Sequence, residues 1–139
     1  MPKQPETKKE VLDILSRALK LEYQMIIHYP RIAKIMSDEQ LASKVDMLGD
    51  DSIKHADAVS HAIRGLGGIP PFPSFEPLSE PVDLKDFFQK QLGLERFALD
   101  LHTQAAEGVG EELAPSLRQL AKQEQSHIKV VEEIISKLP

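Results

Sequence analysis

Apolar residues recur every three or four positions in four segments of the chain, and this spacing constrains the fold more than any other feature. Such a period places one stripe of side chains on one face of an α-helix. No stretch alternates apolar and polar residues over four or more positions, so we predict no β-sheet. The sequence therefore indicates an all-α bundle of four helices, at about residues 6–36, 38–65, 83–107 and 111–138.

The segments between these helices indicate how they are connected. Ser37 followed by Gln40 is typical of a capping box, so we expect a short turn and an antiparallel first hairpin. Two glycines after the third helix predict a second short turn and a second hairpin. The Pro-rich crossover 66–82 cannot be helical, and about 18 extended residues reach roughly 60 Å, beyond the roughly 40 Å of a long helix. We therefore expect two antiparallel hairpins joined by a long crossover in one domain, residues 1–139, with the second and third helices parallel.

The composition excludes several classes of function. The 139 residues include no cysteine, which excludes disulfides, iron–sulfur clusters, zinc–cysteine sites and thiol catalysis. A formal net charge of −5 argues against a nucleic-acid partner. No apolar run approaches the roughly 18 residues that span a bilayer, and the opening segment has no apolar region typical of a signal peptide. We expect a cytoplasmic protein without a membrane partner.

Polar residues interrupt each helical stripe where the pattern calls for apolar ones. They are Glu22 in the first helix, Ser52 and His55 in the second, Glu95 and His102 in the third, and Glu124 and His127 in the fourth. Glu22 lies 15 residues before Ser37, at the first turn, and Ser52 lies 15 residues after it. Glu95 and Glu124 are likewise equally distant from the second turn. Glu22, Ser52 and His55 should therefore lie at one level of the bundle, as should Glu95, Glu124 and His127.

The two hairpins repeat this polar pattern at an offset of 72 or 73 residues. Glu22, Ser52, His55 and Tyr29 correspond to Glu95, Glu124, His127 and His102, in that order. Any one of these residues could be an ordinary hydrogen-bonded core residue, but several carboxylates and imidazoles buried together need a compensating cation. Oxygen ligands mixed with histidine suit iron, manganese or zinc better than copper. The other two histidines, His28 and His61, lie off the stripes and are expected to be exposed.

One Glu from each of two helices, with two Glu-x-x-His helices, is the ligand set of ferritin-like di-iron proteins. The chain resembles bacterioferritin and rubrerythrin-type domains over nearly its whole length. The segment KHADAVSHAIRGLGGIP is similar to the second helix of this family and its exit, and LERFALDLHTQA is similar to its third helix. The resemblance implies terminal carboxylate ligands at Glu22 and Glu95, nitrogen ligands at His55 and His127, and a bridging carboxylate at Glu124. The same three carboxylates, Glu22, Glu95 and Glu124, would be the catalytic residues.

The chain departs from the family pattern at Ser52, where the family carries a second bridging Glu. Three ligand carboxylates then remain in place of four, which favours weaker binding or one iron ion instead of two. Asp51 could reach the site, and His102 could supply a ligand or a hydrogen bond. The resemblance makes Tyr29 a tyrosine that lies just outside the ligands.

The resemblance implies a ferroxidase-type oxidoreductase of iron homeostasis that oxidises Fe(II) with O₂ or peroxide. One alternative is a non-catalytic binding or scaffold bundle with a degenerate metal site. A second is a rubrerythrin-like peroxidase, which would need a separate electron donor. We expect no haem, because Ile53 stands where haem-binding members carry methionine. We also expect a homodimer or small homo-oligomer rather than a 24-subunit cage, because no fifth helix follows before Pro139.

Overall fold

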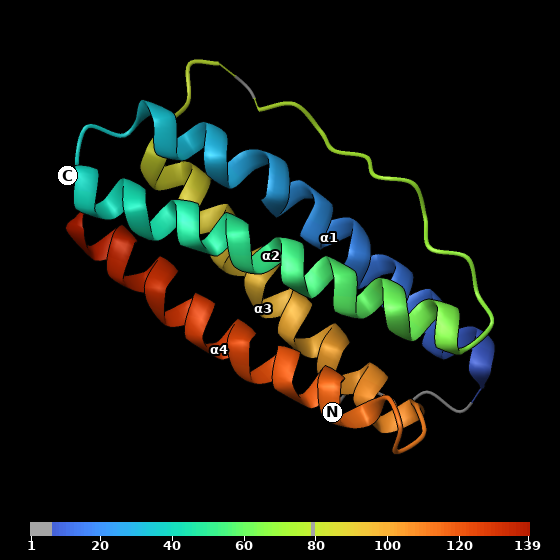
Figure 1. Ribbon diagram of the computed structural model, residues 1–139. Coiled ribbons are helices and arrows are strands. Elements are labelled where there is room, and N and C mark those ends of the chain that lie inside the picture. Colours follow the sequence, from blue (N-terminus) through green and yellow to red (C-terminus); the bar gives the residue numbers. More distant parts are fainter. Residues whose placement is uncertain (1–6, 79) are drawn as a thin grey trace.

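The computed structural model describes residues 7–78 and 80–139, and this part of the chain folds into four long helices without a strand (Figure 1). They are α1 (Lys8–Ile35), α2 (Glu39–Gly65), α3 (Leu84–Gly108) and α4 (Ala114–Lys137). The predicted all-α bundle is confirmed. Across the described ranges, no helix combines the length and apolar character needed to cross a bilayer.

Side chains at the helix starts explain where the first three helices begin. Thr7, Asp38 and Asp83 each accept a hydrogen bond from a backbone N–H group two or three residues later. The predicted capping box at Ser37 is wrong, because the next residue, Asp38, caps α2. Its carboxylate accepts from the backbone N–H groups of Gln40 and Leu41, two groups that a helix start leaves without partners.

The fourth helix begins three residues later than predicted, at Ala114 rather than 111. Residues 111–113 form a turn, and Pro115 lies in the first turn of the helix, where a missing N–H group removes no helical hydrogen bond. The first helix begins at Lys8, two residues after its predicted start, and the other observed ends lie within one residue of those predicted. The predicted start of the first helix, at residue 6, lies outside the described residues.

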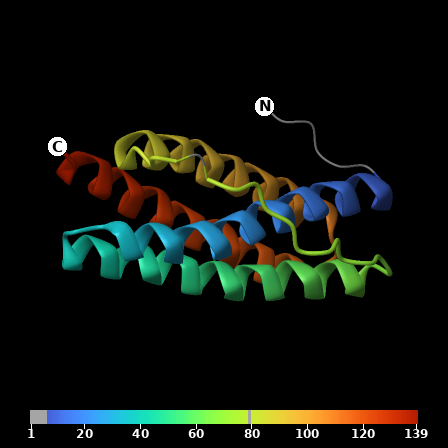
Figure 2. The ribbon, with the colours of Figure 1, turned by 90° about the horizontal axis from the view of Figure 1, so that it is seen from above.

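The helices pack as two antiparallel hairpins, α1 with α2 and α3 with α4, as the short turns predicted (Figures 1 and 2). α1 also contacts α3, and α2 contacts α4. The crossover runs along the length of the bundle, from the end of α2 to the start of α3 (Figure 1). α2 and α3 therefore run parallel, as expected.

The crossover lies against α1 and covers part of it. The Nε2 atom of His28 is 2.6 Å from the backbone oxygen of Glu76, whose own N–H group donates to the side chain of Gln24. These contacts leave His28 only 7% exposed, so the prediction of an exposed side chain was wrong for His28, although it is confirmed for His61. The helical period of α1 does not show which of its outer residues the crossover covers.

The apolar core consists of two clusters that are separated along the helices by buried polar groups. The first apolar cluster contains Val11, Leu15, Leu19, Ala56, Val59, Ala62, Ile63, Ala105, Ala106, Leu117 and Leu120. The second apolar cluster contains Met25, Tyr29, Ile32, Ala33, Leu41, Val45, Leu48, Phe87, Phe88, Val131 and Ile134. Between them lies the polar layer, which we define as Glu22, Ser52, His55, Glu95, His102, Glu124 and His127.

Candidate metal centre

All four helices contribute side chains to the polar layer from the middle of their lengths. On α2 and α4, residues three positions apart share the inward face, which brings His55 beside Ser52 and His127 beside Glu124. α1 and α3 each add one glutamate. Every member of the layer is at most 3% exposed. The common level predicted from the sequence therefore matches the structure.

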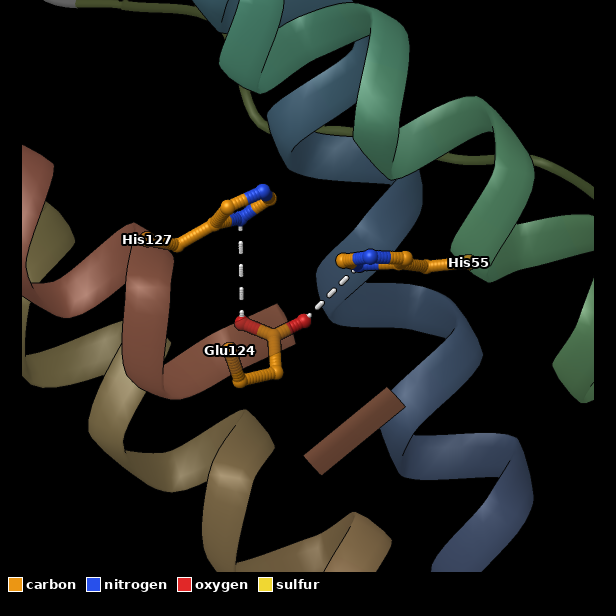
Figure 3. A group of neighbouring side chains, drawn as sticks. All are labelled: His55, Glu124 and His127. Atoms are coloured by element: carbon orange, nitrogen blue, oxygen red, sulfur yellow. Dashed lines mark hydrogen bonds and ion pairs between the residues drawn. The ribbon is translucent and has the colours of Figure 1, made fainter. Parts of the chain in front are cut away.

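Glu124 lies between the imidazoles of His55 and His127 and directs one carboxylate oxygen toward each of them (Figure 3). Its Oε1 is 3.0 Å from His55 Nδ1, and its Oε2 is 4.0 Å from His127 Nδ1. The two rings are stacked with their centroids 5.0 Å apart. A carboxylate in this position could share its two oxygens between neighbouring cations.

Glu22 and His102 complete one half of the layer. Glu22 Oε1 lies 3.5 Å from both His55 Nδ1 and His102 Nε2. His102 Nε2 is also 3.6 Å from Glu124 Oε1. One ligand atom each from Glu22, His102 and Glu124 lies within 4.8 Å of the others, a spacing that could hold a metal ion.

Glu95 and His127 form the other half. His127 Nδ1 is 3.5 Å from Glu95 Oε2, while the hydroxyl of Tyr29 donates a 2.8 Å hydrogen bond to Glu95 Oε1. His55, Glu124 and His127 make up a second group with the spacing of metal ligands. Tyr29 thus holds one oxygen of the Glu95 carboxylate, while the other oxygen faces His127.

Each of the two facing imidazoles is oriented from outside by a residue of the opposite hairpin. His55 Nε2 lies 2.6 Å from Gln123 Oε1, and His127 Nε2 lies 3.1 Å from Asp51 Oδ2. These contacts leave both Nδ1 atoms toward the centre, the arrangement typical of metal-binding histidines. Asp51 therefore contacts a histidine and not the centre itself. Gln123 was missed by the sequence reasoning, although the 72-residue repeat pairs it with Asp51.

Ser52 faces the polar layer but does not take the place of a carboxylate. Its hydroxyl donates a 3.0 Å hydrogen bond to the backbone oxygen of Leu48, one turn earlier in the same helix. The side chain is completely buried. Position 52 therefore contributes no charge to the centre.

The buried acids and histidines shift one another's pKa in the metal-free protein. Burial favours a higher pKa for Glu22, but the neighbouring imidazoles outweigh it and lower the pKa to about 2. Burial would lower the pKa of His55 and His127, yet nearby carboxylates raise these pKa values to about 10 and about 9. Burial, reinforced by a neighbouring carboxylate, raises the pKa of Glu95 to about 7. Protons would therefore compete with a cation for the histidine nitrogens.

Several buried atoms of the polar layer form no hydrogen bond with any described residue. They are both oxygens of Glu22, Oε2 of Glu95 and of Glu124, both nitrogens of His102, and Nδ1 of His127. A buried polar atom without a partner costs about 1–3 kcal/mol. A cation at the centre would satisfy these atoms together, and their oxygen and nitrogen chemistry fits a divalent metal such as iron.

Residues 12–139 match the model of the ferritin family, described as a ferritin-like domain. The chain belongs to the ferritin-like family. The resemblance noted in the sequence is thereby confirmed. None of the curated protein sequences matches this chain.

Several solved structures share this ferritin-like fold. A ferritin-like, di-iron-carboxylate protein of Bacillus anthracis str. Ames matches with a TM-score of 0.80 and 21% identity, covering 95% of this chain and 99% of its own. The bacterioferritin of Desulfovibrio desulfuricans matches with a TM-score of 0.77 and 20% identity, covering 93% of this chain and 80% of its own. A dodecameric thioferritin of Bacteroides fragilis matches with a TM-score of 0.78 and 14% identity, covering 94% of this chain and 86% of its own. At these identities the likeness shows the fold alone.

Within this ferritin-like bundle, the structure brings all of the predicted ligand residues into one layer. They are Glu22, His55, Glu95, Glu124 and His127. Tyr29 and His102, which the repeat pairs with each other, both lie against a glutamate of the opposite hairpin. The two contacts differ, because the hydroxyl forms a hydrogen bond and the imidazole does not.

Proposed function

We propose that this chain binds iron at the polar layer and oxidises Fe(II), with O₂ or peroxide as the electron acceptor. The observation that supports it most is the set of converging buried oxygen and nitrogen atoms that form no hydrogen bond with any described residue. Carboxylate and imidazole ligands suit iron. Two proteins of the same fold are described as a di-iron-carboxylate protein and as a bacterioferritin whose di-iron site was seen in different catalytic states.

In this proposal the three buried glutamates have distinct positions. Glu22 and Glu95 each face one half of the centre, and Glu124 is shared between the halves. Their negative charge favours Fe(III) over Fe(II), because the ion with the higher charge is attracted more strongly. His55 and His127 supply neutral nitrogen ligands once their protons have left. Bound iron supplies the electrons that reduce the acceptor.

Aerobic oxidation of Fe(II) tests this proposal. Absorbance of Fe(III) should rise faster with the protein than in buffer, and Glu124→Ala should abolish tight binding and oxidation. Glu132→Ala is the matched control, since Glu132 lies on the same helix, is exposed, and forms a surface ion pair with Arg96 at 3.8 Å. A folded wild-type protein that neither binds nor oxidises iron would contradict the proposal and favour the scaffold alternative. The observation that favours this alternative is the serine at position 52, where a bridging carboxylate is missing.

Several finer expectations stay predictions. Manganese and zinc are the other metals to test, and a rubrerythrin-like peroxidase activity would appear only with an added electron donor. A Soret band after reconstitution would contradict the expected lack of haem at Ile53. A mass of several hundred kilodaltons in light scattering would contradict a dimer or small oligomer. One domain over residues 1–139 and a cytoplasmic location are likewise predictions.

A further inference from the structure

The two halves of the polar layer are less alike than the sequence repeat suggests. Tyr29 forms a hydrogen bond with Glu95, which leaves only one oxygen of Glu95 for the centre. The repeat pairs His102 with Tyr29, but His102 forms no such hydrogen bond with Glu22, the glutamate of the opposite hairpin that it faces. Instead, neither nitrogen of His102 forms a hydrogen bond in the described part of the chain, and the residue is 0% exposed.

This condition is unusual for a buried imidazole, because buried polar groups are nearly always hydrogen-bonded. One nitrogen of His102 points to the centre: Nε2 lies 3.5 Å from Glu22 Oε1 and 3.6 Å from Glu124 Oε1. His55 Nδ1 faces the same two oxygens, at 3.5 Å and 3.0 Å. Two nitrogens thus share one pair of carboxylate oxygens.

The four nitrogen–oxygen distances are close to the spacing of neighbouring ligand atoms around one metal ion. Metal–nitrogen and metal–oxygen bonds of about 2.0–2.2 Å place neighbouring ligand atoms of a tetrahedral site roughly 3.3–3.6 Å apart. The distances of 3.5, 3.6, 3.5 and 3.0 Å lie at or just below this range. We call this set the first position; it consists of Glu22, His102 and Glu124, whose ligand atoms lie within 4.8 Å of one another, and of His55. His55 Nδ1 faces the same two oxygens, although His55 also has the spacing of a ligand with Glu124 and His127.

The remaining ligand atoms form a poorer set, which we call the second position; it consists of Glu95, Glu124 and His127. His127 Nδ1 is 3.5 Å from Glu95 Oε2 and 4.0 Å from Glu124 Oε2. In the repeat a fourth ligand would come from residue 29, but the Tyr29 hydroxyl donates its hydrogen bond to Glu95. The second position therefore has the longer contacts, and His55 lies closest to the two oxygens of the first position.

We propose that the two positions bind divalent cations with unequal affinity, the first position filling before the second, and that His102 is a metal ligand. His102 would then supply, from α3, the ligand that Ser52 does not supply from α2. This inference rests on metal binding at the polar layer but not on the oxidation of iron.

Stepwise titration of the metal-free protein with Zn(II), followed by calorimetry, and with Co(II), followed by visible absorption, tests the inference. Neither measurement depends on turnover, and zinc has no redox chemistry of its own. We expect two steps whose dissociation constants differ by at least about tenfold, the tighter giving the intense Co(II) spectrum of a four-coordinate site. His102→Phe should remove the tighter step and keep the weaker one. His61→Phe, at an exposed histidine of α2, should change neither.

A second pair of variants keeps the test informative if His102→Phe folds poorly. His102→Tyr introduces the residue that the repeat carries at position 29, and it should weaken the first step in the same way. Adding Ser52→Glu in that background should restore tight binding through a second shared carboxylate. Two equal steps in the wild type, or a first step that His102→Tyr leaves unchanged, would overturn the inference. Stepwise binding without Fe(II) oxidation would refute only the proposed function.

Discussion

Glu124 and Ser52 occupy equivalent positions in the two hairpins, but only Glu124 carries a charge into the centre. Ser52→Glu should therefore raise bound Fe(II) toward two ions per chain. In the metal-free protein the same change should lower the free energy of unfolding by about 1–3 kcal/mol, since a fourth buried carboxylate adds desolvation and repulsion. Metal analysis measures the first effect, and thermal unfolding of the metal-free protein measures the second. An unchanged metal stoichiometry would mean that position 52 does not contribute to a shared site.

Asp51 acts on the centre through His127, whose Nε2 lies 3.1 Å from its carboxylate. Removing such an outer partner typically weakens metal binding 10- to 100-fold, because the imidazole loses its fixed orientation. We expect a loss of about that size at the weaker binding step for Asp51→Ala. Asp50→Ala, at the exposed neighbouring residue, is the control. Equal affinities of the two variants would show that the Asp51 contact does not support binding.

The stability of the metal-free protein should depend on pH through its histidines. The pKa values of His55 and His127 are raised from 6.5 to about 10 and about 9, so their contribution is complete below about pH 6.5 and is lost as pH rises through 9–10. The pKa of Glu22 is lowered from 4.5 to about 2, so its contribution is lost as pH falls from 4.5 toward 2. The melting temperature of chelator-treated protein should therefore fall as the pH rises from 6 to 10. A flat profile would contradict this charge pairing.

Most of the candidate ligands could be predicted from the sequence, because the apolar stripe of a helix faces the core and a glutamate within it is therefore buried. The repeat then fixed their common level. The outer partners could not be predicted in this way. Gln123 is exposed, and its oxygen reaches His55 only because its side chain extends toward the centre. The burial of His28 could not be predicted either, because it depends on where the crossover runs.

At the scale of the helices, Gly49 allows α1 and α2 to approach closely. A Cβ atom at Gly49 would lie 3.3 Å from the ring of Pro30 and 3.4 Å from Tyr29 Cβ. Gly93, in α3, has no neighbouring described atom within 4 Å of such a Cβ. Gly93→Ala should therefore raise the free energy of unfolding by about 1 kcal/mol through helix propensity alone.

Gly49→Ala should instead lower the free energy of unfolding by about 1 kcal/mol, because overpacking against the rigid proline ring outweighs the gain in helix propensity. Denaturant unfolding of the two variants beside the wild type measures the difference. If both substitutions stabilise the protein equally, the close approach of α1 and α2 at Gly49 is not a constraint.

The helices themselves could be predicted nearly to the residue, since their apolar period and the breaks by glycine and proline agree. The ends were less certain where two candidate caps are adjacent. Ser37 and Asp38 both suit the start of α2, and the carboxylate, which can accept two N–H groups, is the one that caps it. The start of α4 has no side-chain cap at all, so the sequence carried no local signal for it.

In the whole molecule, each hairpin supplies half of the candidate centre, so a bound ion would link the two hairpins. Ligands that bind only the folded state stabilise it, by about 2.7 kcal/mol at one hundred times the dissociation constant. Adding Zn(II) should raise the melting temperature of the wild type, and a chelator should reverse the effect. The same addition should not stabilise Glu124→Ala, and an equal shift in that variant would place the ion elsewhere.

The division of the core into two apolar clusters has a consequence for how the protein opens. Each cluster draws on all four helices, and the polar layer between them contributes little apolar contact of its own. Without an ion, either end of the bundle can therefore loosen while the other end stays packed, so amide hydrogens near the two ends should exchange at independent rates. With an ion bound at mid-length, local opening at one end must disturb ligands that also hold the other. Metal would then decide whether the bundle behaves as two cooperative units or as one.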